Sequence, residues 1–168
     1  MKIQVGGLSE GVHRYQFLVP GAELDIGVEF HDDVKVEATL EKTGAQFFLS
    51  ASIETSGHFA CDRCVTEFSI LFDPSYRMFY AQEGADSTQW DPAEVHVVTS
   101  GLNVIDIAED VRQTILLSVP LKLLCRDDCK GLCPHCGKNS NHESCSCTDA
   151  IPDSRWEKLQ SLQKNNFT

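Results

Sequence analysis

The sequence lacks the features that would assign it to a membrane, a secretory route or a familiar enzyme class. It has no run of about eighteen apolar residues, so we expect no transmembrane helix. The opening stretch MKIQVGGLSEGVHRYQF has neither an apolar segment nor a small-residue cleavage site, so we expect no signal peptide. The G-x-G-x-x-G, Walker and H-E-x-x-H strings are also missing. These absences predict a cytoplasmic protein with no small-molecule substrate and no active site.

Basic residues are scarce. The chain has 14 Lys and Arg residues and 25 Asp and Glu residues, which give it a net charge of −11. An acidic body repels the phosphate backbone of nucleic acids. Any contact with RNA is therefore expected to go through a basic protein or through one locally basic patch. The alternative interpretation is that the acidity only keeps the chain soluble.

What is present is a globular composition, with 42% hydrophobic residues in a chain of 168, enough for one compact domain with a small appendage. The first half alternates as β-strands do. Apolar residues occupy every second position in Val34–Glu41, and residues 45–54 repeat the pattern after a turn at Gly44. Further strand patterns lie at residues 13–19, 66–72, 76–81 and 95–98.

A helix is predicted over residues 104–118, where the period of the apolar residues changes from two to that of a helix. The residues on its apolar side are Ile107, Ala108, Val111, Ile115 and Val119. Asp106 and Glu109 form a capping-box pattern near its start, and Pro120 ends it. The tail PDSRWEKLQSLQ offers a second, short helix.

These patterns predict an α+β fold, in which one long helix covers an antiparallel sheet of about five to seven strands. Residues 1–124 are expected to form this core. Residues 125–149 are expected to form a Cys-rich knuckle packed on the core, and residues 150–168 a C-terminal helix or tail.

Eight cysteines carry the chemistry of the chain, and six of them lie between Leu124 and Cys147. They form four short pairs: Cys61 and Cys64, Cys125 and Cys129, Cys133 and Cys136, and Cys145 and Cys147. Structural disulfides are rare in a reducing cytosol. Short turns between cysteines instead bring two thiolates to one ion, and a structural Zn²⁺ takes four such ligands. The sequence therefore predicts two Zn²⁺ per chain.

The pairs can be divided between two sites in two ways. In the first, a local knuckle is made of Cys133, Cys136, Cys145 and Cys147. The remaining four cysteines then join the distant CDRC string to the end of the helix, which is where a cross-link between far segments is most useful. The rival is a zinc ribbon made of Cys61, Cys64, Cys133 and Cys136.

Other uses of these residues are less consistent with the pattern. A redox C-x-x-C usually opens a helix after a strand, whereas Cys61 lies between two strand patterns. His135 and His142 could replace a cysteine as ligands, but eight thiols already suffice, so we predict that both are exposed loop residues. Catalytic zinc keeps a coordination position open, and four-thiolate sites are closed. We therefore predict a structural metal and neither a zinc enzyme nor a redox enzyme.

Several strings together resemble the YceD family: CDRC after a hairpin, a helix ending LLSVPLKLLC, CRDDCKGLCPHCGKN with CSC, and a closing PDSRWEKL. The resemblance covers most of the chain from Cys61 to Leu159, and CKGLCPHCGKN is its most specific part. YceD proteins are bacterial large-ribosomal-subunit rRNA accumulation proteins with plastid relatives. The resemblance implies a non-enzymatic factor that is needed for accumulation of large-subunit rRNA.

The expected partners are large-subunit precursors, contacted through either a ribosomal protein or rRNA. The knuckle carries the one locally basic region, Arg126, Lys130 and Lys138, and neighbouring carboxylates dilute it. Zinc knuckles can contact RNA. In so acidic a chain, however, we favour contact with a basic protein. The competing interpretation is a zinc-pinned general or transcriptional adaptor.

Overall fold

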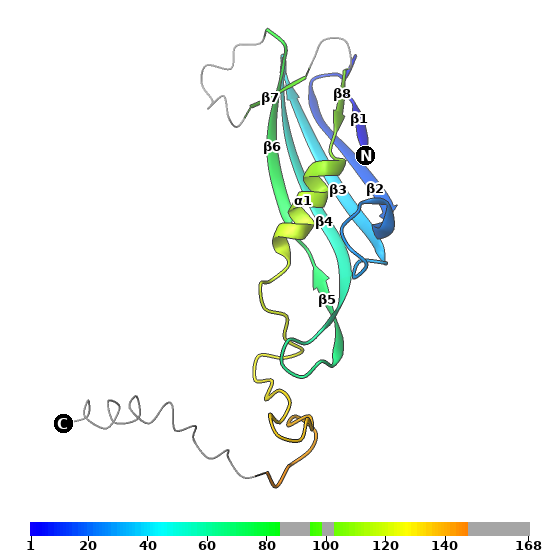
Figure 1. The fold of residues 1–168 in the computed structure, drawn as a ribbon. Helices are drawn as coiled ribbons and strands as arrows, with labels where there is room; N and C mark the ends of the chain where they lie inside the picture. Colours follow the sequence, from blue (N-terminus) through cyan, green and yellow to red (C-terminus); the bar gives the residue numbers. More distant parts are fainter. Residues whose placement is uncertain (85–94, 99–102, 148–168) are drawn as a thin grey trace, which may run out of the picture.

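A computed structural model describes residues 1–84, 95–98 and 103–147 of the chain (Figure 1). The strands in these ranges are β1 (Lys2–Gln4), β2 (Gly11–Pro20), β3 (Asp33–Thr43), β4 (Gln46–Ala60), β5 (Glu67–Phe72), β6 (Ser75–Gln82), β7 (Val95–Val98) and β8 (Val104–Asp106). A 3-10 turn, η1 (Gly21–Glu23), follows β2, and one helix, α1 (Ala108–Ser118), follows β8. The body is elongated, and the chain after α1 extends from one of its ends (Figure 1).

The centre of the sheet is the hairpin of β3 and β4, which the alternation of apolar residues predicts. Leu40 pairs with Leu49, and Val36 pairs with Ile53. All four side chains are at most 1% exposed. The intervening residues face the other side of the sheet and are exposed or half-buried. The prediction of a hairpin with one buried face and one solvent-exposed face is confirmed.

The large sheet is mixed, which corrects the prediction of an antiparallel sheet. Its strand order is β2-β3-β4-β6-β7, and β5 pairs with the far part of β4. The β6–β7 pair is parallel. Twelve residues separate Gln82 from Val95, which is enough for the crossover that a parallel pair needs. Alternation within a strand shows which side is buried but not in which direction its neighbour runs.

A second layer, made of α1 and a small β1–β8 ribbon, covers the sheet (Figure 1). Ile107, Val111 and Ile115 of the predicted helical stripe are fully buried in the same core as β3 and β4. At its edge the Tyr80 hydroxyl of β6 donates a hydrogen bond to Asp110 of α1, 3.2 Å. The helix is therefore attached to the sheet by apolar packing and by a polar contact.

The predicted start of the helix at residue 104 is wrong, because residues 104–106 form β8. Ile105 pairs with Ile3 of β1, so these β-branched residues have a strand partner that the helical period does not reveal. The Asp106 carboxylate still accepts a hydrogen bond from the Ala108 N–H, 3.1 Å. Glu109 accepts from Arg112 and Gln113, so the two acids do not form a reciprocal capping box.

Two further points follow from the described ranges. The C-terminal helix predicted within residues 150–168 lies outside them. Inside them, the single helix is much too short to cross a lipid bilayer.

Candidate metal centres

The structure gathers the eight cysteines into two groups of four. Cluster I consists of Cys61, Cys64, Cys125 and Cys129, and cluster II consists of Cys133, Cys136, Cys145 and Cys147. Within each group the sulfur atoms all lie within 4.8 Å of one another. These are the two sets of the first partition. In the rival ribbon Cys133 and Cys136 would join Cys61 and Cys64, whereas in the structure they lie with the two cysteines that follow them.

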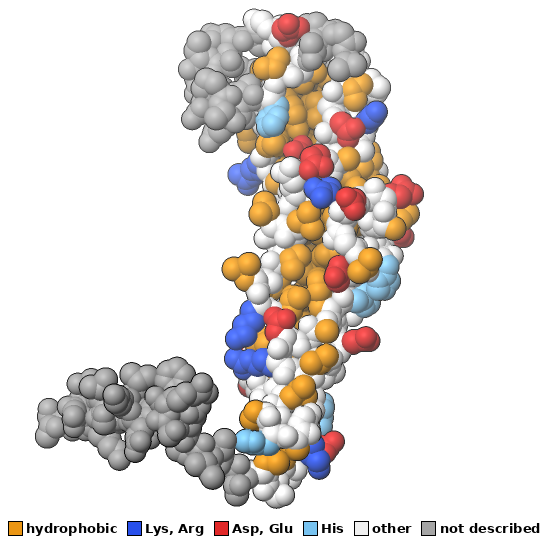
Figure 2. Space-filling view, viewed as in Figure 1, with side chains coloured by type: hydrophobic (Ala, Val, Ile, Leu, Met, Phe, Trp, Pro, Cys, Tyr) orange, Lys and Arg blue, Asp and Glu red, His pale blue; other side chains and the backbone are white. Residues whose placement is uncertain are grey.

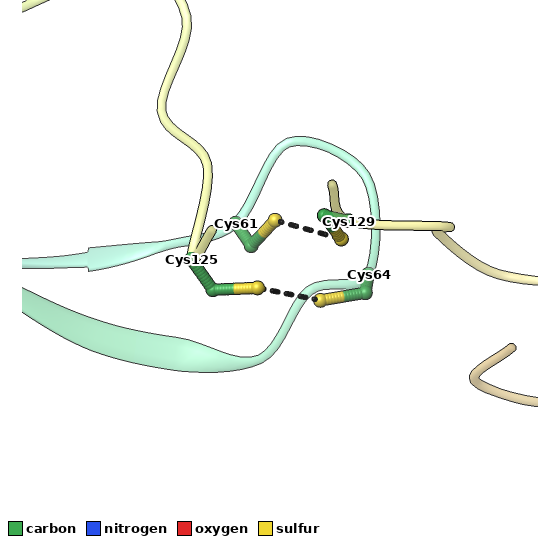
Figure 3. A group of neighbouring side chains, drawn as sticks. All are labelled: Cys61, Cys64, Cys125 and Cys129. Atoms are coloured by element: carbon green, nitrogen blue, oxygen red, sulfur yellow. Dashed lines mark hydrogen bonds between the residues drawn. The ribbon is translucent and has the colours of Figure 1, made fainter. Parts of the chain in front are cut away.

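Cluster I joins the turn between β4 and β5 to the segment after α1 (Figure 3). The Sγ atoms of Cys61 and Cys129 are 3.8 Å apart, and those of Cys64 and Cys125 are 3.6 Å apart. Sulfur atoms placed tetrahedrally about 2.3 Å from one zinc ion lie about 3.8 Å apart. A disulfide needs sulfurs about 2.05 Å apart, and all eight thiols are free. The spacing is therefore that of a four-thiolate metal site.

Both C-x-x-C strings fold into the same turn. The Val65 N–H donates to the Cys61 carbonyl, 2.9 Å, and the Gly137 N–H donates to the Cys133 carbonyl, also 2.9 Å. The donor follows the second cysteine and has a positive φ in both turns, 58° at Val65 and 73° at Gly137. Glycine takes this left-handed backbone easily, and a β-branched residue does so only with strain. The turn is therefore enforced at Val65 by its surroundings.

Backbone contacts hold the β4–β5 turn against the later segment. The Asp62 N–H donates to the Leu123 carbonyl, 2.8 Å, and the Asp62 carboxylate accepts from the Leu123 N–H, 2.6 Å. The Arg63 guanidinium donates to the Cys129 carbonyl, 2.7 Å, and the Arg63 carbonyl accepts from the Leu132 N–H, 3.1 Å. The middle residues of CDRC thus fix the distant segment that supplies the other two thiols of cluster I.

Cluster II is a local loop that is more exposed than cluster I. The Cys133 N–H donates to the Lys138 carbonyl, 2.8 Å, which closes the loop, and the Sγ atoms of Cys145 and Cys133 are 3.5 Å apart. Cys133 is buried, whereas Cys136 and Cys145 are exposed. We call residues 61–66 and 124–147, which hold both clusters, the tip.

Asn141 connects the two clusters. Its Nδ2 group donates to Cys129 Sγ of cluster I, 3.3 Å, and to Asn139 Oδ1, 2.8 Å. Its Oδ1 atom accepts from the Lys130 N–H, 2.8 Å, and from the Arg126 guanidinium, 2.7 Å. The CGKNSN string therefore carries a structural asparagine pair, Asn139 and Asn141, as well as a metal-ligand turn. Asn141 was not predicted from the sequence, because its contacts with Lys130 and Cys129 join residues eleven and twelve positions apart.

The thiols within each cluster differ in acidity. Burial raises the pKa of the Cys61 thiol, but backbone N–H groups, that of Cys125 foremost, outweigh it and lower that pKa to about 6. In cluster II backbone N–H groups, led by that of Cys136, lower the pKa of Cys133 to about 6. Burial raises the pKa of the Cys125 thiol to about 12. Backbone N–H groups thus favour the thiolate form of one cysteine in each cluster, and a bound divalent cation would displace the remaining protons.

The predicted basic region lies on the tip, but its charges are partly neutralised. Arg126 forms an ion pair with Asp128, 3.3 Å, and Lys138 forms one with Glu143, 3.4 Å. Both ion pairs are solvent-exposed, and Lys130 is exposed as well. The three cations therefore do not form a continuous positive surface.

A third group of metal-ligating side chains was not predicted. His31, Asp32 and His58 bring their ligand atoms within 4.8 Å of one another. Asp32 accepts hydrogen bonds from Ser56 and from His58, and Ser69 contacts the other ring nitrogen of His58. The first two ligands lie just before β3 and the third lies in β4, so no short sequence spacing reveals the group.

The sequence also contains a G-x-S-x-G string, Gly7–Gly11, the pattern of a hydrolase nucleophile elbow. That elbow requires a strand followed by a helix. Here Ser9 lies in an exposed turn between β1 and β2, and its carbonyl is in contact with the His13 ring. The string therefore has no structural support as a catalytic motif.

The fold and the tip define a small α+β protein with two four-cysteine clusters that could hold metal ions. A family model described as "Large ribosomal RNA subunit accumulation protein YceD" matches residues 49–163, which include all eight cysteines, and the chain belongs to the YceD family.

Individual relatives match over different lengths. A chloroplastic YCED homolog 1 of Arabidopsis thaliana is 32% identical over 60 residues, which are 36% of this chain and 19% of that protein. A Zea mays protein of the same description is 37% identical over 68 residues, 40% of this chain and 22% of its own length. An uncharacterized protein of Mycobacterium leprae is 24% identical over 144 residues, 84% of this chain and 64% of its own length. This chain thus spans about a fifth of the plant relatives. No solved structure matches it.

Proposed function

We propose that this protein is a non-enzymatic, cytoplasmic factor that supports accumulation of large-subunit (23S) rRNA and assembly of the large ribosomal subunit. The observation that carries the proposal is the family match over residues 49–163, because that segment contains both cysteine clusters. The free thiols are consistent with the reducing compartment in which ribosomal subunits are made.

In this proposal each cluster holds one structural Zn²⁺. Four thiolates close the coordination sphere of zinc and leave no position for a substrate. The spacing of about 3.8 Å required between sulfurs is close to the 3.6 and 3.8 Å found in cluster I. The metal therefore stabilises the shape of the tip, and recognition falls to the side chains and backbone around it.

We favour a basic ribosomal protein over pre-rRNA as the direct partner. Acidic and basic side chains are scattered over the face of the body shown in Figure 2, and neither forms a broad field. Residues 23–33 carry five carboxylates and no lysine or arginine. On the tip, two of the three candidate cations are already paired with carboxylates. Phosphate recognition requires unpaired positive charge, so the charge distribution suits a cationic protein better.

Co-sedimentation with large-subunit precursors tests the assembly role. We expect the protein to sediment with these particles and to dissociate from them as the salt concentration rises. Deletion of its gene should lower the amount of large-subunit rRNA relative to small-subunit rRNA. An unchanged rRNA ratio together with no co-sedimentation would reject the assembly role. The general or transcriptional adaptor would then be the better interpretation.

A charge-reversal pair of variants tests the tip. Changing Arg126, Lys130 and Lys138 to Glu should weaken the association, because in this proposal these cations meet acidic side chains of the otherwise basic partner and so orient the tip on it. The matched control changes three exposed cations on the outer face of the sheet, Arg14, Lys35 and Arg77, to Glu. It alters the net charge equally. Equal weakening by both variants would show that only the total charge matters and would reject the role of the tip.

A further inference from the structure

We propose that His31, Asp32 and His58 form a third metal site, separate from the cysteine clusters, that binds a first-row divalent transition metal such as Ni²⁺, Cu²⁺ or Zn²⁺. Two imidazoles and one carboxylate suit these ions, whereas Mg²⁺ and Ca²⁺ prefer oxygen ligands alone. The site does not depend on the proposed role in ribosome assembly. Histidine side chains gather at one edge of the body in Figure 2.

One pair of ligand atoms already has the spacing of a metal site. His58 Nε2 lies 2.9 Å from Asp32 Oδ2. Two ligand atoms about 2.1 Å from one ion, at right angles to each other, lie about 3.0 Å apart. The His31 ring stacks on the His58 ring, with centroids 4.3 Å apart and an angle of 20° between the planes. A ligand nitrogen of His31 lies within 4.8 Å of the ligand atoms of Asp32 and His58, and the exposed His31 ring would have to tilt out of the stack to direct its lone pair at the same ion.

The segment that carries two of the ligands is fixed by its neighbours. Phe30, just before His31, is 2% exposed and packs edge-on against Phe59 of β4, with centroids 5.7 Å apart. The Asp32 carbonyl accepts a hydrogen bond from the Gly21 N–H, 3.1 Å. On the facing strand, the His58 N–H donates to the Glu29 carbonyl, 2.9 Å. The backbone that presents the ligands is thus held in place on both sides, as a preorganised site requires.

Two serines orient the ligands. The Ser56 hydroxyl donates to Asp32, and hydrogen bonds from Ser56 and then His58 hold the pKa of the Asp32 carboxyl below its usual range. Ser69 Oγ lies 3.0 Å from His58 Nδ1. Metal-bound histidines almost always form such a hydrogen bond through their second ring nitrogen.

Binding of an ion changes which ring nitrogen of His58 carries the proton. A carboxylate only accepts hydrogen bonds, so His58 Nε2 carries the proton that it donates to Asp32, and Nδ1 shares a hydrogen bond with the Ser69 hydroxyl. An ion at Nε2 requires the neutral tautomer with its proton on Nδ1, which then donates to Ser69 Oγ. The hydroxyl can serve in either direction by rotating. The contact between Nδ1 and Ser69 Oγ is therefore compatible with an ion at Nε2.

The site is open to solvent. His31 and His58 are exposed, and beside them lies a hollow lined also by Phe59, Glu67 and Phe68. Three protein ligands leave at least one coordination position for water or another small ligand. This separates the site from the cysteine clusters, where four thiolates would complete the coordination sphere of a zinc ion.

Equilibrium dialysis of the complete purified chain with Ni²⁺ tests the proposal. Wild-type protein should bind one more equivalent than His58→Ala or His31→Ala. The matched control, His13→Ala, removes a histidine from β2 and should bind as the wild type does. All variants keep eight cysteines, so Ni²⁺ held by the clusters is common to them. Equal stoichiometry in the wild type and both site variants would overturn the proposal.

A second measurement guards against loss of folding in a ligand variant. Ser69→Ala keeps all three ligands and should weaken Ni²⁺ binding roughly 10–100-fold, as losses of an orienting hydrogen bond do. In wild-type protein paramagnetic Ni²⁺ should broaden the amide NMR signals of residues 31, 32 and 58. Broadening confined to the cysteine residues, with unchanged affinity in Ser69→Ala, would reject the site.

Discussion

Val65 and Gly137 occupy the same position in two copies of one turn, each with a positive φ and each donating its N–H to the carbonyl of the first cysteine, 2.9 Å away. Glycine suits that position and valine does not. A non-glycine residue held in the left-handed region costs about 1–3 kcal/mol. The first turn therefore stores strain that the second does not.

Replacing Val65 by Gly is expected to stabilise the protein by roughly 1 kcal/mol, because the relieved strain exceeds the loss of about 0.4–1 kcal/mol from a more flexible unfolded chain. Denaturant unfolding measures this. The control is Val12→Gly, at an exposed strand residue without a positive φ, which should destabilise. A loss of stability in Val65→Gly would show that its side chain matters more than its backbone.

The reverse change, Gly137→Ala, should destabilise the tip by about 1–2 kcal/mol, the cost of the left-handed region for an L-residue. A Cβ atom at residue 137 would meet no atom within 4 Å, so the effect comes from the backbone alone. Amide exchange in residues 133–145 should quicken, while exchange in β3 should not change. Unchanged exchange in the tip would contradict the argument.

Elemental analysis of the protein purified without added metal should find two zinc ions per chain, and a chelator should destabilise the tip. Cys61→Ser should lower global stability more than Cys145→Ser, because Cys61 is 2% exposed and joins distant segments, whereas Cys145 is exposed in a local loop. Thermal melts and amide exchange of both variants test this. Equal global losses would indicate that the two clusters fold as one unit.

Asn141→Ala should destabilise the tip by roughly 1–3 kcal/mol, because the Lys130 N–H loses its acceptor and Cys129 Sγ loses its amide donor. Zinc content should not change, since no sulfur is lost. His142→Ala, at an exposed neighbour, is the matched control and should have little effect. A loss of zinc from the His142 variant would instead identify that histidine as a ligand.

The two tyrosines of β6 should titrate at unusually high pH. Burial, and then the Asp110 carboxylate, raise the pKa of Tyr76 and Tyr80 above the ordinary value of 10.0. A raised folded-state pKa contributes stability below the unfolded value, and this is lost as pH rises through the folded value. Phenolate absorbance should therefore appear together with alkaline unfolding. Asp110→Asn should shift the appearance of phenolate to lower pH, and the absence of a shift would contradict the assigned cause.

The sequence predicted those parts of the fold whose information is local. Alternation located β3 and β4 because one face of the sheet is fully buried, and the spacing of Ile107, Val111 and Ile115 located the helix for the same reason. It did not predict β1 or β8. Each of these strands has three residues, which are too few to show the alternation of apolar and polar residues. Each is a strand because it pairs with the other.

The candidate sites divide in the same way. Short cysteine spacings identified the paired thiols, and the turns at Cys61 and Cys133 have the expected knuckle form. The group of His31, Asp32 and His58 could not be predicted from the sequence, because it forms only when β4 folds back beside the segment before β3. Asn141 escaped for a similar reason, since neither side of its contact with Cys129 is unusual by itself.

The length of β4 has a mechanical consequence. This 15-residue strand pairs with β3 and β6 near its start and with β5 near its end, and it leads directly into Cys61. At about 3.3 Å per residue it spans roughly 50 Å. Because β4 is paired along its whole length, we expect it to be rigid. A force that turns the cysteine turn would then turn the helix-covered body with it. Paired spin labels on the tip and on β2 should report one narrow distance distribution, and a partner held by the tip would keep a fixed bearing relative to the rest of the molecule.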